Sequence, residues 1–168
     1  MSDTLYTRFD MMDEDDFGTI HERVTTIAEV VHGHFGVLAE FRRRPGRWLL
    51  WIDVDHVTCP DCGENSGRYV QFAFLEDGAS VIGECCAGHF LHDDLKYSPD
   101  EEDALRDIGW KDPDEVLTRN WHLEVTSDDE LLMLSRMTER TFTEVFGLDP
   151  GARAVVKFQE RIMDGRPR

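Results

Sequence analysis

The chain has 168 residues, of which 40% are hydrophobic and 32% charged, a composition that predicts a folded chain rather than a disordered one. Its formal net charge is −17, and the resulting negative field opposes direct binding to DNA, RNA or anionic lipid. The sequence has no run of about 18 apolar residues and no secretory signal pattern at its start, so we expect neither a membrane partner nor secretion.

The first part of the chain predicts an acidic arm followed by a helix. Residues 1–18 are rich in Asp and Glu and lack apolar periodicity, so we expect a flexible arm. A helix is then predicted, with Thr19 as its N-cap and Gly33 as its end. Its apolar residues recur every three or four positions: Ile20, Val24, Ile27 and Val31. Residues 34–43 fit either a continuing helix or a strand.

A basic turn separates this region from the predicted strands. Pro45 and Gly46 stand in the order of a type II turn. Four arginines surround it: Arg42, Arg43, Arg44 and Arg47. Two interpretations stay open, a solvated turn or a contact for an acidic segment of a partner.

The centre of the chain predicts antiparallel strands. Residues 47–57 alternate in the manner of a strand, and residues 68–75 and 79–86 predict a hairpin around Asp77-Gly78, a type I′ turn signal. This turn fixes the pairing register of the two strands.

The register sorts the hairpin residues into two faces. Phe72 opposite Gly83 and Phe74 opposite Val81 form an apolar face, which we assign to the core. The opposite face is a mixture of polar and apolar side chains and does not look built for water. Another element, a partner chain or a bound segment is therefore expected to cover it.

The last third of the chain predicts a helix, a short strand and two more helices. Residues 98–101 form a capping box, and the helix that they begin runs to Ile108 before Gly109. Residues 120–125 are strand-like. Ser127 is expected to cap a helix that ends at Gly147, and residues 149–162 a last helix. We therefore predict an α+β domain over residues 19–149 and a C-terminal helix and tail over residues 150–168.

The four cysteines predict a metal site. They are too few for a disulfide scaffold, which favours a cytoplasmic location with reduced or metal-bound thiols. Cys59 and Cys62 have the spacing of a zinc knuckle, and the hairpin register brings Cys86 to the same end of the sheet. With His89 they make four ligands for a structural zinc, and His92 is a substitute ligand. Cys85 points to the core face and is interpreted as a buried apolar residue. The alternative to the zinc site is four reduced cysteines, two of them buried.

No catalytic constellation is recognisable in the sequence. It lacks HExxH, GxSxG, Walker A and dinucleotide glycine motifs, and no HxE precedes a PCxxC pattern. A thioredoxin-like redox centre is also disfavoured, because glycine-rich residues 63–67 follow the CxxC where a helix should begin. We therefore expect no enzyme.

Several core residues in order resemble a known family. They are Tyr69-Val70-Gln71-Phe72, Glu84, Phe90-Leu91, Leu105, Gly109-Trp110, Pro113, Asn120-Trp121 and Val145-Phe146-Gly147. This order resembles the YbjN-like and type III secretion chaperone-like domains of bacteria over about residues 66–150. The resemblance implies a curved antiparallel sheet with helices packed on it, often paired as a homodimer. The implied role is the capture of a segment of a client protein. The cysteine knuckle lies outside this pattern.

The sequence thus yields two hypotheses from different classes. The first is a non-enzymatic chaperone or adaptor that binds a peptide segment of a client protein on the mixed face of the sheet. The residues expected on this peptide-binding or dimer surface are Trp51, Tyr69, Gln71, Ala73, Ile82 and Glu84. The second is an acidic nucleic-acid mimic that inhibits a DNA-binding enzyme, which the net charge of −17 suggests.

Overall fold

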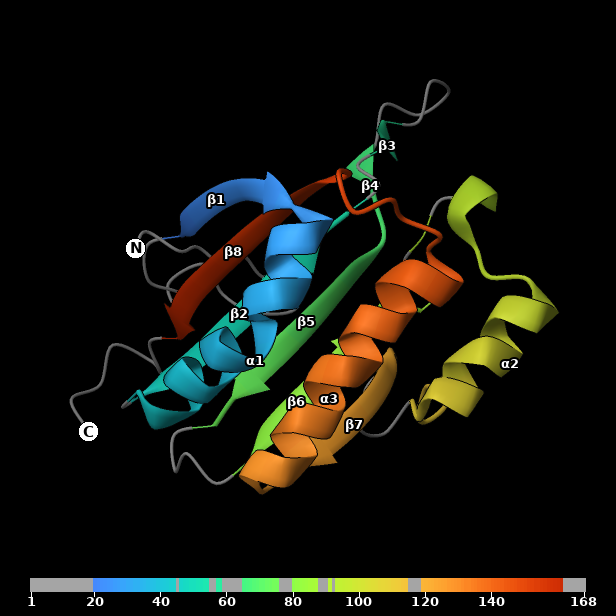
Figure 1. The fold of residues 1–168 in the computed structure, drawn as a ribbon. Coiled ribbons are helices and arrows are strands. Elements are labelled where there is room, and N and C mark those ends of the chain that lie inside the picture. Colours follow the sequence, from blue (N-terminus) through green and yellow to red (C-terminus); the bar gives the residue numbers. More distant parts are fainter. Residues whose placement is uncertain are drawn as a thin grey trace.

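The structure, a computed structural model, describes residues 20–44, 46–54, 57–58, 65–75, 80–87, 91, 93–114 and 119–161. These residues form an α+β fold with a six-stranded antiparallel open sheet and three α-helices, as the sequence predicts (Figure 1). The sheet has the order β1-β8-β2-β5-β6-β7. Its strands are β1 (His21–Thr26), β2 (Arg47–Asp53), β5 (Tyr69–Phe74), β6 (Val81–Cys85), β7 (Trp121–Val125) and β8 (Arg153–Arg161).

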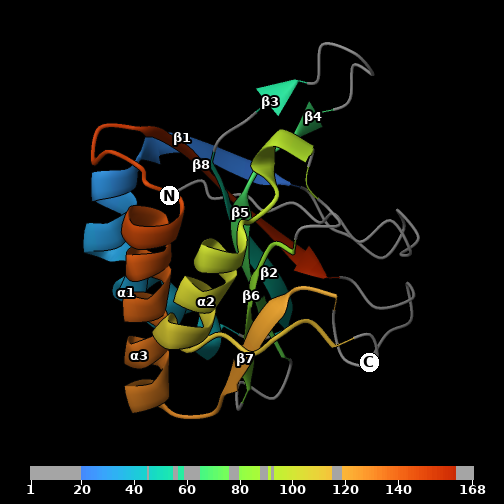
Figure 2. The same cartoon turned by 90° about the vertical axis from the view of Figure 1, so that its right-hand side faces the viewer.

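The helices lie together on one side of this sheet (Figure 2). They are α1 (Ile27–Arg43), α2 (Pro99–Ile108) and α3 (Asp128–Arg140). Helix α3 continues into a π-helical turn at Thr141–Val145, Asp93–Leu95 form a short 3-10 helix, and β3 (Val57–Thr58) pairs with β4 (Asn65–Ser66) apart from the main sheet. Helices α1 and α3 pack against each other over the sheet.

The core lies between the helices and the sheet. Phe72 at the centre of β5 and Leu134 of α3 are both fully buried. Gly83 on β6 is needed at this contact, because a Cβ atom there would lie 2.7 Å from a methyl carbon of Leu134. The sheet and α3 therefore approach more closely at this point than any larger residue would permit.

The predicted helix at residues 20–33 is wrong in its first half. Residues 21–26 form strand β1, and α1 begins only at Ile27, with Thr26 as its N-cap. The helix continues through Gly33 to Arg43, which settles the ambiguous residues 34–43 as helix. The helical spacing of residues 20–26 is outweighed by a tertiary interaction. All six residues of β1 pair with β8, and such pairing overrides the local periodicity of the sequence.

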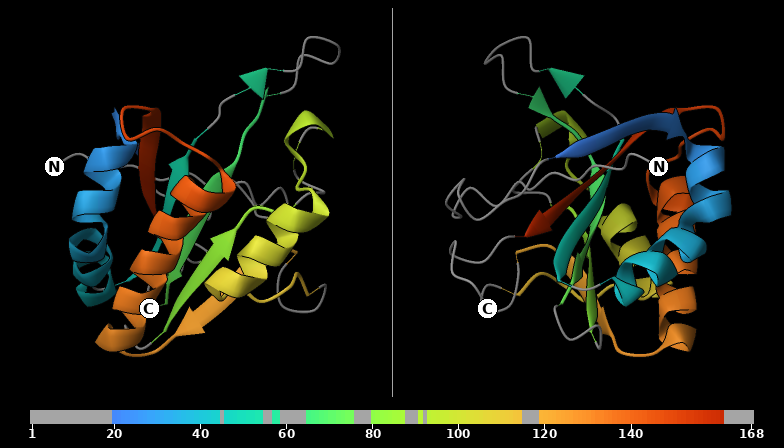
Figure 3. Two further views of the ribbon diagram at one scale, coloured as in Figure 1. Left: turned by 45° about the vertical axis from the view of Figure 1, so that its right-hand side comes forward. Right: turned by 90° about the vertical axis from the view of Figure 1, so that its left-hand side faces the viewer.

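The predicted C-terminal helix is also wrong. Residues 153–161 form strand β8, which lies between β1 and β2 and is therefore part of the main sheet. The side chains of β8 alternate between the two faces of the sheet, as expected of a strand. Ala154 and Phe158 are buried on the helix-covered face, and Lys157 points to the other face. The two errors are connected, because β1 and β8 pair with each other (Figure 3).

The arm predicted over residues 1–18 lies outside the described residues. The strand predicted over residues 47–57 forms as β2 but ends at Asp53.

The predictions of the hairpin, the helix that ends at Ile108, the short strand and the helix that Ser127 caps are confirmed. The hairpin has the predicted register, with Phe72 opposite Gly83. The capping box of α2 is complete, and Gly109 ends this helix with a φ of 128°. Ser127 caps α3, accepting a hydrogen bond from the Glu130 amide at 3.2 Å.

Candidate functional site

The six residues predicted as a binding surface lie on one face of the sheet, but most of them are buried within the chain. The pairing places Trp51, Gln71 and Glu84 side by side across three strands. Together with Tyr69, these side chains are at most 5% exposed. Ala73 and Ile82 are partly exposed. The mixed face is therefore largely covered in the isolated chain.

The polar groups of this face are satisfied internally. The amide of Gln71 donates a hydrogen bond to the carboxylate of Glu84. The indole of Trp51 donates to Asp53 at 2.9 Å, and Lys157 pairs with the same carboxylate at 2.8 Å. These side chains thus hold one another across neighbouring strands.

The predicted metal ligands are only partly within the structure. Cys59, Cys62 and His89 lie outside the described residues, so the zinc site stays a prediction. Cys86 is fully buried, and its sulfur accepts a hydrogen bond from the Tyr69 amide at 3.3 Å and lies 3.0 Å from the Tyr97 hydroxyl. Over the described ranges, no group of three His, Cys, Asp or Glu residues is placed to hold a metal ion.

The thiol of Cys86 has an unusual environment. Burial alone would raise the pKa of this thiol, but hydrogen bonds from the neighbouring Cys85 thiol, the Tyr97 hydroxyl and the Tyr69 amide bring it below its usual value. Cys85 is fully buried, as predicted, and burial raises the pKa of its thiol well above the usual value.

Two of the four arginines around the predicted basic turn, Arg42 and Arg44, take part in interactions within the chain. Arg42 pairs with Asp128 at 2.6 Å and donates to the carbonyl of Thr126 at 2.7 Å. Arg44 pairs with Glu40 at 2.5 Å and lies over the ring of Phe41. Arg42 and Arg44 are thus engaged by acceptors of the chain itself, which weakens the interpretation of a contact for an acidic segment of a partner.

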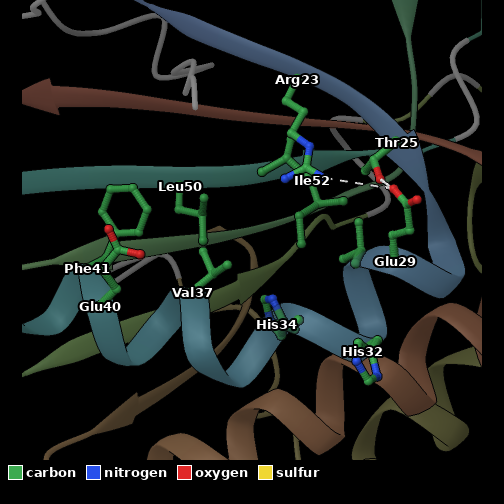
Figure 4. A pocket seen from close by; sticks show the side chains of 13 residues that line it. Arg23, Thr25, Glu29, His32, His34, Val37, Glu40, Phe41, Leu50 and Ile52 are labelled. Carbon is green, nitrogen blue, oxygen red and sulfur yellow. Dashed lines mark hydrogen bonds and ion pairs between the residues drawn. The ribbon is translucent and has the colours of Figure 1, made fainter. Parts of the chain in front are cut away.

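A groove of about 400 Å³ lies between α1 and the sheet edge formed by β1 and β8 (Figure 4). We call it the α1–β1 groove. Its floor consists of the apolar side chains of Leu50 and Ile52 on β2 and Val156 on β8. One wall is α1, which contributes the apolar side chains Val30, Val37 and Phe41, and the other wall is β1, which contributes Arg23 and Thr25.

The polar rim of the groove is held by contacts of its own residues. Glu29 on α1 accepts a hydrogen bond from Thr25 on β1 and lies 3.9 Å from the guanidinium of Arg23. These contacts tie the first turn of α1 to the edge strand. Glu40 and His32, also on α1, complete the polar lining. An apolar floor with a few polar groups at the rim is typical of sites that bind an amphipathic ligand.

Two residues that line the groove have features that the described part of the chain does not explain. The Nε2 atom of His34 is buried, and no described residue forms a hydrogen bond with it. Gly33 lies in the middle of α1, where glycine costs about 1 kcal/mol relative to alanine, yet a Cβ atom there would meet no atom within 4 Å.

A second cavity, of about 570 Å³, lies on the other side of the sheet around the ion pair between Asp53 and Lys157. Glu22 and Arg153 also line it. Its central charges already pair with each other, and it offers less apolar surface to a peptide than the α1–β1 groove does.

Sequence reasoning missed the α1–β1 groove because it missed β1 and β8, which form its edge. The available signal was the stripe Val30, His34, Val37 and Phe41, which has helical spacing and would have marked one face of α1. Gly33 interrupts this stripe. Within the part of the chain that the structure describes, no helix combines the length and the apolar character needed to cross a membrane.

Comparison with known proteins identifies a family but no individual relative. No curated protein and no solved structure matches the chain. Residues 39–152, more than half of the chain, match the family described as TY-Chap3, "T3SS (YopN, CesT) and YbjN peptide-binding chaperone 3". The resemblance inferred from the core residues of the sequence is thereby confirmed. The chain belongs to this family of peptide-binding chaperones.

Proposed function

We propose that this protein is a non-enzymatic chaperone or adaptor that binds a segment of a client protein in the α1–β1 groove. The observation that carries the proposal is the groove itself, an apolar floor bounded by a helix and an edge strand. The family is one of peptide-binding chaperones, which supports the same role. Burial of apolar client side chains on Leu50, Ile52 and Val156 would provide most of the affinity.

The edge strand gives the client a second means of attachment. Among the described strands, β1 pairs only with β8, and its residues 21–24 are exposed. An extended segment can therefore hydrogen-bond to β1 while its alternate side chains enter the groove. The net charge of −17 favours client segments with basic residues, chiefly by raising the association rate.

The mixed face of the sheet is the competing site for the same function. Four of its six predicted residues are buried, so a client could reach them only by displacing the parts of the chain that cover them. Ile82 is the large apolar side chain of this set that stays partly exposed. A substitution of Ile82 therefore reports on the competing site without disturbing the groove.

Three expectations from the sequence belong to this proposal. The protein acts in the cytoplasm, it pairs as a homodimer, and it binds structural zinc through Cys59, Cys62, Cys86 and His89. The resemblance implies the homodimer, and the spacing of the cysteines suggests the zinc. The proposal rests on none of the three, since the groove is formed by a single chain.

The experiment begins with the native partner, recovered by pull-down from the host and identified by mass spectrometry. The segment that binds is then synthesised, and its Kd for the wild type and for the variants Val37→Asp, Ile82→Asp and Met133→Asp is measured at low and high salt. Val37→Asp places a charge in the wall of the groove and should weaken binding at least about tenfold. Met133→Asp changes a residue of α3 that is 45% exposed and lies outside the groove lining, and should bind like the wild type.

Two other outcomes would point to the competing binding site or to the competing function. If Ile82→Asp abolishes binding and Val37→Asp does not, the client binds to the mixed face of the sheet. If neither variant matters and affinity falls steeply with salt, the nucleic-acid mimic is the correct function. Circular dichroism of each variant shows that a loss of binding is not a loss of fold.

A further inference from the structure

The face of the sheet opposite the helices is buried, although none of the described helices covers it (Figure 2). Alternation along the strands places five buried residues of the middle strands on this mixed face: Leu49, Trp51, Gln71, Glu84 and Gln159. Each of these side chains is at most 5% exposed. A sheet face without a second layer is open to water, so a further part of the chain must lie over these residues.

The buried part of the mixed face is limited to the middle of the sheet. Val24 of β1, which alternation places on the same face, is 56% exposed. At the other edge, Glu124 of β7 is exposed and Ile82 of β6 is partly exposed. The layer thus lies over β8, β2, β5 and part of β6, an area that a single segment of chain can cover.

The segments outside the described residues differ in length and in attachment. The internal ones are at most six residues long and are fixed at both ends, and the last one, residues 162–168, has seven residues. Residues 1–19, which we call the N-terminal segment, lead directly into the edge strand β1. A segment of this length can extend about 60 Å, whereas β6 lies about 20 Å from β1 across the sheet. The N-terminal segment therefore has the reach to cross the whole buried area.

The N-terminal segment also complements the mixed face in charge. Strand β8 contributes Arg153 and Lys157 to this face, where both line the second cavity. The N-terminal segment has five carboxylates between residues 10 and 16, and it has apolar side chains at positions 5, 9 and 12. Residues 162–168 instead contain two arginines and one aspartate, and would bring like charges beside Arg153 and Lys157. Charge thus favours residues 1–19 as the cover.

We propose that the N-terminal segment docks across the mixed face of the sheet and occupies the competing client site. Its apolar side chains cover Leu49 and Trp51, and its carboxylates lie toward Arg153 and Lys157. This inference goes beyond the proposed function and does not depend on the α1–β1 groove.

The docked segment closes the mixed face to a client in the resting protein. A short tether holds a segment near its site at an effective concentration of about 1 mM. A client segment must therefore outcompete the N-terminal segment to reach Trp51, Gln71 and Glu84. The α1–β1 groove needs no such displacement.

The test compares two full-length variants whose N-terminal segments carry the same net charge. The apolar-to-Asp variant removes three side chains that would cover the mixed face, by Leu5→Asp, Phe9→Asp and Met12→Asp. The control variant adds the same three charges at polar positions of the segment, by Ser2→Asp, Thr4→Asp and Thr7→Asp. A charged side chain is costly to bury on apolar surface, so the first variant should release the segment and the second should not.

Quenching of tryptophan fluorescence by acrylamide measures the cover over Trp51. In the apolar-to-Asp variant the accessible fraction of the emission should rise by about one quarter, because Trp51 is one of four tryptophans. The rise should disappear when Trp51→Phe is added to the same variant, which assigns it to the mixed face. The control variant should be quenched like the wild type, and circular dichroism should be the same for all these proteins.

Photocrosslinking gives a second measurement on a chain whose N-terminal segment is native. p-Benzoylphenylalanine is placed at position 82, at the border of the buried area, and the protein is irradiated without any client. Mass spectrometry of the single-chain band should find a crosslink to residues 1–19. The same residue at position 133, on the exposed side of α3, should give none. Should the apolar-to-Asp variant fail to fold, this measurement decides alone.

The inference is overturned if the apolar-to-Asp variant is quenched like the wild type, or if the control variant shows the same rise. A crosslink from position 82 to residues 162–168 in place of residues 1–19 would also overturn it. A crosslink to residues 1–19 that occurs only between two chains would show that a second copy supplies the cover, which contradicts docking within one chain.

Discussion

The imidazole of His34 lies against the ring of Phe72 at a centroid distance of 5.0 Å, so a titratable group of α1 is packed directly on the central strand of the sheet. This contact lies between the core and the α1–β1 groove. Because burial favours the neutral imidazole, the free energy of unfolding should depend on pH through His34.

Acidification should destabilise the protein through His34. Its pKa is about 3 when folded and about 6.5 when unfolded, so the unfolded chain binds more protons below pH 6.5. The stability that neutral His34 contributes is therefore present above pH 6.5 and is lost as the pH falls toward 3. Between pH 7.5 and pH 5 the loss should reach about 2 kcal/mol.

Urea unfolding of the wild type and of His34→Gln at both pH values measures this loss. Other ionisable residues line the same groove, namely Arg23, Glu29, His32 and Glu40, and they are present in both proteins. The difference between the two proteins therefore isolates His34. Equal losses in the two proteins would show that His34 is not buried in its neutral form.

Gly33→Ala should stabilise the protein and weaken client binding. The added methyl group meets no atom of the chain, so α1 should gain about 0.5–1 kcal/mol in the free energy of unfolding. The same methyl group enters the groove and should hinder its occupant.

Gly36→Ala is the matched control for this prediction. Gly36 is in the same helix, and a Cβ atom there also meets nothing within 4 Å, but it does not line the groove. It should give a similar gain in thermal stability with unchanged affinity. If both variants bind the client equally well, the space beside Gly33 is not used.

Gly83→Ala should destabilise the contact between β6 and α3. The new Cβ atom would lie 2.7 and 2.9 Å from the two methyl carbons of Leu134, so this fully buried side chain would have to shift within a packed core. We expect a loss of about 1–3 kcal/mol. In a Leu134→Ala background the same change should cost much less, because the clash is gone. Additive losses in the double variant would contradict the close packing.

The zinc hypothesis is tested by metal analysis. Purified protein should contain close to one zinc per chain, and Cys62→Ser should lose the metal and melt at a lower temperature, because structural zinc contributes to folding free energy. Cys85→Ser is a useful comparison, since Cys85 lies in the core and is not among the predicted ligands. Metal-free wild-type protein would rule the site out.

The parts of the fold that local signals specify were predictable from the sequence. The capping box before α2, the Ser127 cap of α3 and the hairpin of β5 and β6 depend on residues a few positions apart. The strands β1 and β8 are distant in sequence and stabilise each other by pairing. The apolar residues at positions 20, 24 and 27 satisfied a helical spacing, although Val24 is 56% exposed.

The candidate site was harder to predict than the fold. The mixed face was identified correctly as not solvated, but its side chains are covered within the chain. The α1–β1 groove needs β1 and β8 as well as α1, so two misassigned elements concealed it. The unpaired atom of His34 is a property of three-dimensional packing and leaves no mark in the sequence.

Site-specific crosslinking tests the central claim most directly. The photoreactive residue p-benzoylphenylalanine is placed in separate variants at positions 37, 82 and 133, and each is irradiated with the client peptide. Position 37 lies in the groove, position 82 on the mixed face of the sheet and position 133 on the exposed side of α3. The account predicts a strong crosslink at position 37 and little at the other two. A crosslink at position 82 without one at position 37 would contradict it.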